Sequence, residues 1–219
     1  MERFRDQSQA MCNLAATLLF LDRKGEATTH YEKARALGAA HGFFTVECSA
    51  CQGLGLTAVK EGRLEEGVEL LRSALAAVPL CEDKNPAREL AVLSTLINAL
   101  FKMDAFDELE TLVPRYREAA QEQSRSSGRL DVMELDSLLF RARLHEARGK
   151  PQDAAAEVRA LLDLMRENQE AVHAMLSACQ VLRDATTHLK VLDPELGEEE
   201  LIKSVEAELA NLVRMEGEA

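Results

Sequence analysis

The sequence has few aromatic residues and few residues that interrupt helices. Only 4% of its 219 residues are aromatic, Trp is absent, and the chain holds 5 Pro and 11 Gly. Because 47% of the residues are hydrophobic, the core can be large, but it must be built mainly from aliphatic side chains. Little Pro and Gly beside abundant Ala, Leu, Glu and Arg is typical of a chain made of long helices.

Extended apolar segments are also missing. No stretch reaches about 18 apolar residues, so we expect no membrane-spanning helix. The apolar segment 10–21 follows Arg3 and Arg5 as in a signal peptide, but polar residues interrupt it and no small-residue cleavage motif follows. The 5 cysteines are scattered through apolar stretches, which favours buried thiols in a reducing compartment over a disulfide framework. These features predict a cytoplasmic protein.

Long runs of Lys and Arg are absent from a chain whose formal net charge is −12. Duplex nucleic acid would be repelled, so we expect no nucleic-acid partner. We also expect no membrane partner, because no apolar stretch is long enough to span a membrane. The last third of the chain is acidic, with consecutive Glu198, Glu199 and Glu200 followed by four more glutamates. This segment is either a solvated helix face or a surface that favours a basic peptide partner.

Motifs that gather catalytic or cofactor-binding groups are absent too. The sequence lacks the serine nucleophile motif, the phosphate-binding P-loop, the dinucleotide-binding glycines and the zinc-binding H-E-x-x-H pattern. The 5 histidines do not fall at metal-ligand spacing. We therefore expect no enzyme activity, no metal and no cofactor.

The sharpest local pattern is C-x-x-C-x-G-x-G, which runs from Cys48 and Cys51 to Gly55 and matches the zinc-binding unit of DnaJ-type chaperones. Structural zinc takes four ligands, usually from two such pairs, and only one pair is present. A redox-active pair usually begins a helix that follows a strand, and no strand is predicted here. A thiol- or zinc-based sensor at these two cysteines is a minor alternative function.

What the sequence does contain is an internal repeat. Apolar residues at three- and four-residue steps, the period of a helix, precede each of several short helix-breaking segments. These segments are 24–25, 61–63, 103–105 and 149–151. The position shortly after each segment holds Ala27, Gly67, Leu109 and Ala154, at spacings of 40, 42 and 45 residues. Each unit is thus predicted to be two antiparallel helices that must stack on neighbouring pairs to bury their apolar faces.

These units resemble tetratricopeptide repeats. That family places a small residue early in the second helix, a large residue four positions later and another small residue three positions after that. Two units carry the whole pattern, with Ala27, Tyr31 and Ala34 in one and Gly67, Leu71 and Ala74 in the other. The spacing exceeds the usual repeat of about 34 residues and is closer to the longer-helix repeats, of about 40 residues, in kinesin light chains and spindle adaptors.

The resemblance implies an all-α fold, a right-handed α-solenoid of antiparallel helix pairs with about 10 helices and a C-terminal capping helix. We expect one domain over 1–219, with repeats over about 6–41, 43–80, 86–124 and 131–166 and a terminal helix pair over 168–216. Leu109 and Pro114 depart from the pattern in the third unit, where Pro114 should kink the second helix. Residues 125–129 are the candidate flexible joint.

The family resemblance also implies a function, which is binding a partner protein or peptide in the concave groove lined by the first helices. Counting from the small-residue positions places these residues in the groove: Asn13, Ala16, Gln52, Leu56, Lys60, Ser94, Asn98, Lys102, Phe140 and Arg143. Cys12, Ala16 and Gly53 occupy the positions where the family's chaperone-tail clamp carries Lys and Asn, so that clamp is not expected.

Two roles remain open, an adaptor that binds its partner in the groove and a structural scaffold subunit of a larger assembly. The sequence leaves the partner and the oligomeric state open.

Overall fold

The computed structural model describes residues 2–168 together with three isolated positions, 203, 207 and 210. The terminal helix pair predicted over 168–216, and the capping helix within it, lie outside the described residues apart from those positions.

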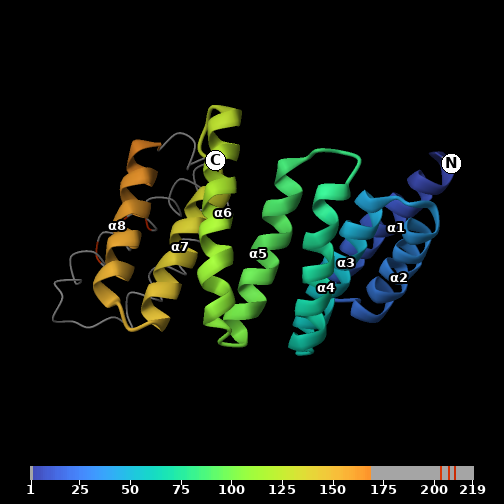
Figure 1. The fold of residues 1–219 in the computed structure, drawn as a ribbon, viewed down its shortest axis with the longest axis horizontal. Helices are drawn as coiled ribbons and strands as arrows, with labels where there is room; N and C mark the ends of the chain where they lie inside the picture. Colours follow the sequence, from blue (N-terminus) through green and yellow to red (C-terminus); the bar gives the residue numbers. More distant parts are fainter. Residues whose placement is uncertain (1, 169–202, 204–206, 208–209, 211–219) are drawn as a thin grey trace. The chain divides into compact units, whose positions relative to one another are not determined.

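The described part of the chain is helical throughout and contains no strand, which confirms the all-α prediction (Figure 1). Each helix is joined to the next by a short turn or loop. The helices are α1 Glu2–Phe20, α2 Lys24–His41, α3 Phe44–Lys60, α4 Leu64–Ala77, the 3₁₀-helix η1 Val78–Leu80, α5 Pro86–Lys102, α6 Phe106–Ser127, α7 Val132–Ala147 and α8 Pro151–Glu167.

Two compact units divide the chain, with the boundary between Ala105 and Phe106. In unit 1, each of the helices α1 to α5 packs against the next, and α3 also contacts α1 and α5. In unit 2, α7 packs against both α6 and α8. The contacts of α1 with α2, α3 with α4 and α7 with α8 agree with three of the predicted pairs. The pair over 86–124, the single domain and the repeat boundaries stay predictions.

Left-handed residues make the tight turns between paired helices. Gly62 has a φ of 83° and Gly149 a φ of 67°, both within predicted helix-breaking segments, and Asp104 adopts a φ of 52° in a third. The first turn differs from the prediction, because Asp22 makes it with a φ of 57° and Gly25 lies inside α2. Aspartate tolerates this conformation better than most residues, so the turn needs no glycine.

Residues 125–129, the predicted flexible joint, form the end of α6 and a hydrogen-bonded turn. The helix passes through Pro114 and continues to Ser127. The Ser124 hydroxyl oxygen accepts a hydrogen bond from the Asp131 amide at 3.1 Å. Asp131 in turn caps α7 by accepting one from the Met133 amide at 2.9 Å. These bonds tie the end of α6 to the start of α7. The flexibility of this segment stays a prediction.

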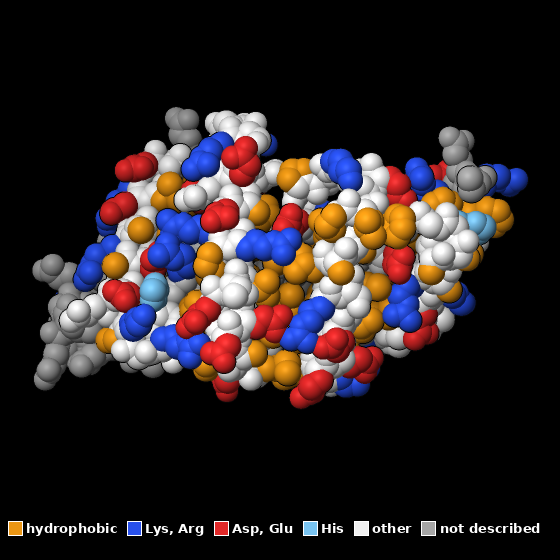
Figure 2. Space-filling view, in the orientation of Figure 1, with side chains coloured by type: hydrophobic (Ala, Val, Ile, Leu, Met, Phe, Trp, Pro, Cys, Tyr) orange, Lys and Arg blue, Asp and Glu red, His pale blue; other side chains and the backbone are white. Residues whose placement is uncertain are grey.

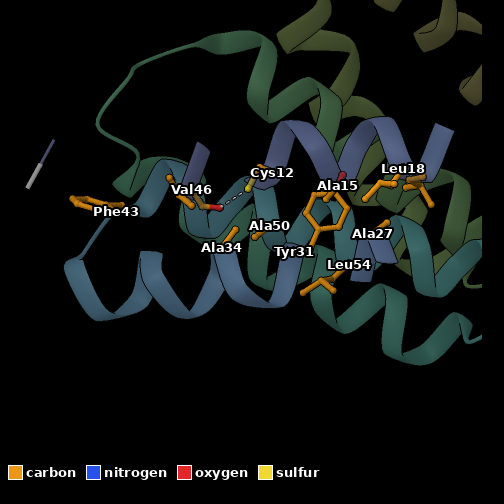
Figure 3. Close-up of a cluster of buried hydrophobic side chains, with 11 residues drawn as sticks. Cys12, Ala15, Leu18, Ala27, Tyr31, Ala34, Phe43, Val46, Ala50 and Leu54 are labelled. Atoms are coloured by element: carbon orange, nitrogen blue, oxygen red, sulfur yellow. Dashed lines mark hydrogen bonds between the residues drawn. The ribbon is translucent and has the colours of Figure 1, made fainter. Parts of the chain in front are cut away.

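The core of unit 1 surrounds Tyr31, whose ring packs on α3 (Figure 3). Tyr31 of α2 is buried against α1 and α3, and its ring covers Gly53. A Cβ atom on residue 53 would lie only 2.1 Å from Tyr31 Cζ. The Cys12 thiol donates to the Val46 carbonyl oxygen at 3.9 Å in the same cluster, which links α1 to α3.

A second close approach brings α3 against α4. A Cβ atom on Gly55 would lie 2.7 Å from Leu71 Cγ and 3.0 Å from the Gly67 carbonyl oxygen. A Cβ atom on Gly67 would lie 2.6 Å from a methyl carbon of Val59 and 3.0 Å from the Gly55 carbonyl oxygen. The two glycines therefore face each other across the helix crossing, in keeping with the small-residue positions predicted for a helix pair.

The start of α3 is capped from a distant part of the chain. Its own N-cap residue, Phe43, makes no side-chain cap hydrogen bond. Instead, the carboxylate of Glu82, in the loop before α5, accepts hydrogen bonds from the amides of Phe44 at 3.0 Å and Thr45 at 2.9 Å. Thr45 also donates its hydroxyl to Asp83 at 3.0 Å. The loop thereby satisfies helix-terminal amides that would otherwise need water.

This capping sets the protonation of the Glu82 carboxyl group. Desolvation alone would raise its pKa, but the hydrogen bonds from Thr45 and from the amides of Thr45, Glu82 and Phe44 outweigh it and lower the pKa to about 2. The carboxylate is therefore ionised at neutral pH.

Replacing Gly55 with Ala should destabilise unit 1, because the new methyl group meets a buried leucine and a backbone carbonyl. Overpacking costs about 1–3 kcal/mol, whereas helix propensity gains only about 1 kcal/mol when Ala replaces Gly. We expect a net loss of up to about 2 kcal/mol in the free energy of unfolding, measured by urea denaturation with circular dichroism.

Gly25→Ala is the matched control, since residue 25 is helical and no atom lies within 4 Å of an added Cβ. It should leave stability unchanged or raise it by up to about 1 kcal/mol. Equal losses in both variants would show that the close helix approach at Gly55 does not limit stability.

Replacing Glu82 with Gln should lower stability at neutral pH by about 1 kcal/mol, the usual cost of a weakened helix cap. The folded pKa of about 2 lies below the ordinary value of 4.5, so the carboxylate stabilises the fold above pH 4.5 and this contribution is lost as pH falls toward 2. The stability difference between Glu82→Gln and the parent chain, measured by urea unfolding, should therefore shrink from about pH 6 to about pH 3.

The control is Glu32→Gln on the exposed side of α2, which should change stability little at either pH. A difference at Glu82 that stays constant with pH would contradict the capping role of its charge.

Candidate partner-binding surface

Most of helix α3 is buried between its neighbours. Within 46–59 its accessible residues form one stripe, with Glu47 the single exception. The stripe consists of Thr45, Ser49, Gln52, Leu56 and Lys60, at steps of three and four residues that keep one face of a helix. Three of the residues predicted to line the groove, Gln52, Leu56 and Lys60, therefore share this accessible stripe of α3.

The accessible side chains of α5 continue this surface. Asn98 and Lys102 are exposed, and Ser94 is partly exposed, again at four-residue steps. Arg88, in the first turn of α5, donates from Nη1 to the hydroxyl of Ser49 at 2.9 Å, which links α5 to the stripe of α3. The Asn98 side-chain amide donates to the Ser94 carbonyl oxygen at 3.0 Å and so lies along its own helix.

Helix α1 borders the stripe of α3 on its other side. Asn13 and Ala16 are exposed, and Asn13 accepts a hydrogen bond from the Gln9 side chain at 3.1 Å. Gln9 itself lines a pocket together with Thr45 of α3. We call the accessible stripes of α1, α3 and α5 the first-helix face of unit 1.

A pocket of about 360 Å³ opens where the first-helix face meets the loop before α5. It combines apolar side chains with charged ones. Its lining residues are Arg5, Asp6, Gln9, Phe43, Thr45, Val46, Glu82 and Asp83. Sequence reasoning missed this pocket, because Glu82 and Asp83 lie in a loop outside any helical period.

Fixed hydrogen bonds hold two of the pocket carboxylates in place. Besides the Thr45 hydroxyl, Asp83 accepts from Arg88 Nη2 at 2.6 Å, and Arg88 is largely buried. Desolvation would raise the pKa of Asp83, but the bonds from Arg88 and Thr45 lower it. The Arg5 guanidinium lies over the Phe43 ring, 5.2 Å from its centroid.

Two predicted groove residues lie in unit 2. Phe140 is buried at 4% exposure and packs edge-on against Tyr116 with 5.3 Å between ring centroids. Placing it in a ligand groove was therefore wrong, since its ring fills the core between α6 and α7. Arg143 is partly exposed on α7.

The two cysteines of the C-x-x-C pattern are packing residues of α3. Both are buried, and Cys48 Sγ donates to the Ala74 carbonyl oxygen at 3.4 Å. Burial first, and then the neighbouring Cys81 thiol, raises the pKa of Cys48 to about 12. The described residues include no group of three or more His, Cys, Asp or Glu side chains arranged to hold a metal ion. Desolvation raises the pKa of both cysteines and outweighs Arg88, which lowers the pKa of Cys48 in part, and Arg35, which lowers that of Cys51 in part.

A charged network in unit 2 is also invisible in the sequence. Glu157 of α8 pairs with Arg141 of α7 at 2.7 Å and with Arg117 of α6 at 3.3 Å. Burial raises the pKa of Glu157, while the charges of Arg141 and His145 lower it in part. The carboxylate ties three helices together, which is a structural role.

Acidic and basic side chains are interspersed over the helices on the face that Figure 2 shows. None of the described helices is long and apolar enough to cross a membrane.

Comparison with known proteins finds similarity in structure only. No protein-family model and no curated protein sequence matches the chain. A Podosopora anserina protein, described as a kinesin light chain with nearly identical TPR-like repeats, aligns with a TM-score of 0.68 and 16% identity over 96% of both chains. BtubC (BKLC) from P. vanneervenii aligns with a TM-score of 0.56 and 14% identity over 98% of this chain and 91% of its own.

YrrB, a TPR protein with an unusual peptide-binding site, aligns with a TM-score of 0.53 and 15% identity over 94% of both chains. At these identities the similarity concerns the fold. The chain therefore has the fold of tetratricopeptide-repeat proteins, the family that its sequence resembles.

Proposed function

We propose that this chain is a protein-interaction module and that the first-helix face of unit 1 is a groove that binds an extended segment of a partner protein. The observation that carries the proposal is the accessible stripe of α3, a helix that contacts both α1 and α5. A fold whose neighbours include a peptide-binding TPR protein supports an interaction role in general.

The side chains along this face suit an extended peptide. Gln52 and Asn98 carry amide groups that can donate to and accept from a peptide backbone. Leu56, partly exposed between them, packs its inner side on the core of unit 1 and offers its outer side to an apolar side chain. Such a mixture gives backbone hydrogen bonds for affinity and a shallow apolar site for specificity.

Contacts within unit 1 also hold the face in place. The glycine contacts hold α3 against α2 and α4, and Glu82 fixes the start of α3. Because these elements are ordered already, binding costs little additional conformational entropy in the protein.

A structural scaffold subunit is the second candidate, and one observation favours it. Phe20 is 88% exposed and Leu21 58% exposed at the end of α1, with Leu14 also exposed on the same helix. Exposed apolar residues close together indicate a surface that another protein covers. A cytoplasmic location, a role as an adaptor, the absence of catalysis and a contribution of Arg143 to partner binding stay predictions.

The double substitution Gln52→Ala and Asn98→Ala should abolish capture of a groove-bound partner and leave the melting temperature unchanged, because it removes surface amides and little packing. Quantitative affinity purification with mass spectrometry measures which proteins bind the parent chain and are lost with the variant.

The control pairs Glu32→Ala with Ser73→Ala, which removes polar groups from exposed positions of α2 and α4. Partners of the groove should persist in this control. Retention of every partner by the Gln52 and Asn98 variant would instead favour the scaffold role.

A further inference from the structure

The two ends of the first-helix face carry opposite charges. At one end, the pocket presents the carboxylates of Asp6, Glu82 and Asp83. At the other end, Lys60 and Lys102 are the last residues of α3 and α5, and both are exposed.

The geometry of α3 and α5 shows that these groups mark opposite ends. Glu82, four residues before α5 begins, binds the first amides of α3, so both helices start at the same edge of unit 1 (Figure 1). Each helix is 17 residues long, so both end at the other edge. Lys60 and Lys102 therefore both lie at the edge of unit 1 that is away from the pocket.

The pocket suits the side chain of a lysine or arginine. Its lining holds three carboxylates and one guanidinium, and one carboxylate remains in excess after Arg88 is counted against Asp83. Asp6 is exposed at its rim, and Arg5 is directed onto the Phe43 ring. Phe43 and Val46 form the apolar floor of the pocket and are buried at 5% and 1% exposure.

Side-chain charges set the sign at each end. The termini of α3 carry partial charges of the opposite sign, but these amount to only about half an elementary charge and decay within one turn. At the start of α3 the Glu82 carboxylate already accepts two of the amides that produce this partial charge.

The separation of the two ends gives the length of the ligand. From Thr45 to Lys60 the stripe rises over about 22 Å, at about 1.5 Å per residue. An extended peptide covers about 3.3 Å per residue, so this distance corresponds to about seven residues.

We propose that the first-helix face selects an extended partner segment in which a Lys or Arg, held in the pocket, is separated by about seven residues from an Asp or Glu held by Lys60 and Lys102. This inference rests on the proposed function, because it specifies the segment that the groove binds.

The experiment starts by selecting a phage-displayed library of random twelve-residue peptides on the full chain. We expect enrichment of peptides that carry a basic and an acidic residue about seven positions apart. A fluorescently labelled enriched peptide is then titrated with each variant and its Kd is measured by anisotropy.

Asp6→Lys should weaken binding of the enriched peptide by about threefold to tenfold, since it replaces a surface attraction with a repulsion. Lys102→Glu should weaken binding by a similar factor. The control Glu32→Lys makes the same charge change on α2, outside the face, and should leave the Kd unchanged. In a charge-swapped peptide, the basic residue is changed to an acidic one and the acidic residue to a basic one. This peptide should bind the Asp6→Lys, Lys102→Glu double variant more tightly than it binds the parent chain.

Two results would overturn the proposal in distinguishable ways. In the first, the enriched peptides lose affinity for the Gln52→Ala, Asn98→Ala variant, but they lack the charge spacing or bind Asp6→Lys normally. This result would refute the charge selection and leave groove binding standing. No enrichment, or peptides insensitive to Gln52→Ala and Asn98→Ala, would refute groove binding and this inference together.

Discussion

The close approach of α3 to its neighbours is the constraint on which unit 1 depends. Gly53 accommodates the ring of Tyr31, and Gly55 faces Gly67 where α3 crosses α4. Side chains at these positions would separate the helices and open the core. Because α3 is enclosed in this way, its accessible residues are reduced to one stripe, and the same packing that stabilises the unit defines the surface available to a partner.

The loop before α5 links this packing to the charge of the surface. Glu82 caps α3, and Asp83 is held by Arg88 and Thr45. The carboxylates serve the fold first, yet they also line a pocket at one end of the first-helix face. A stabilising cap and a candidate recognition site therefore share the same groups, so substitutions in this loop should be interpreted only with a measurement of stability.

Particular residues show why some positions were predictable. Gly67 was expected at a helix crossing because the period of the repeat and the need for a small side chain are both readable in a short stretch of sequence. The burial of Phe140 was not predictable. Counting along a helix gives the face on which a residue lies, but not which neighbouring helix packs on that face, and here Tyr116 of α6 packs against the Phe140 ring. The first turn lies at Asp22 and not at the predicted segment 24–25, because an aspartate adopts the left-handed conformation that a glycine usually signals in a sequence.

The sequence by itself determined that the described part of the chain is helical, and it placed Gln52, Leu56 and Lys60 on one face of α3, because helical period and small residues act over a few neighbouring positions. The tertiary structure alone decided that Glu82 caps a helix 37 to 38 residues earlier and that Glu157 joins three helices. It also brought carboxylates from a loop and from α1 into one pocket. These contacts form only when distant segments meet, and no local pattern specifies which segments will do so.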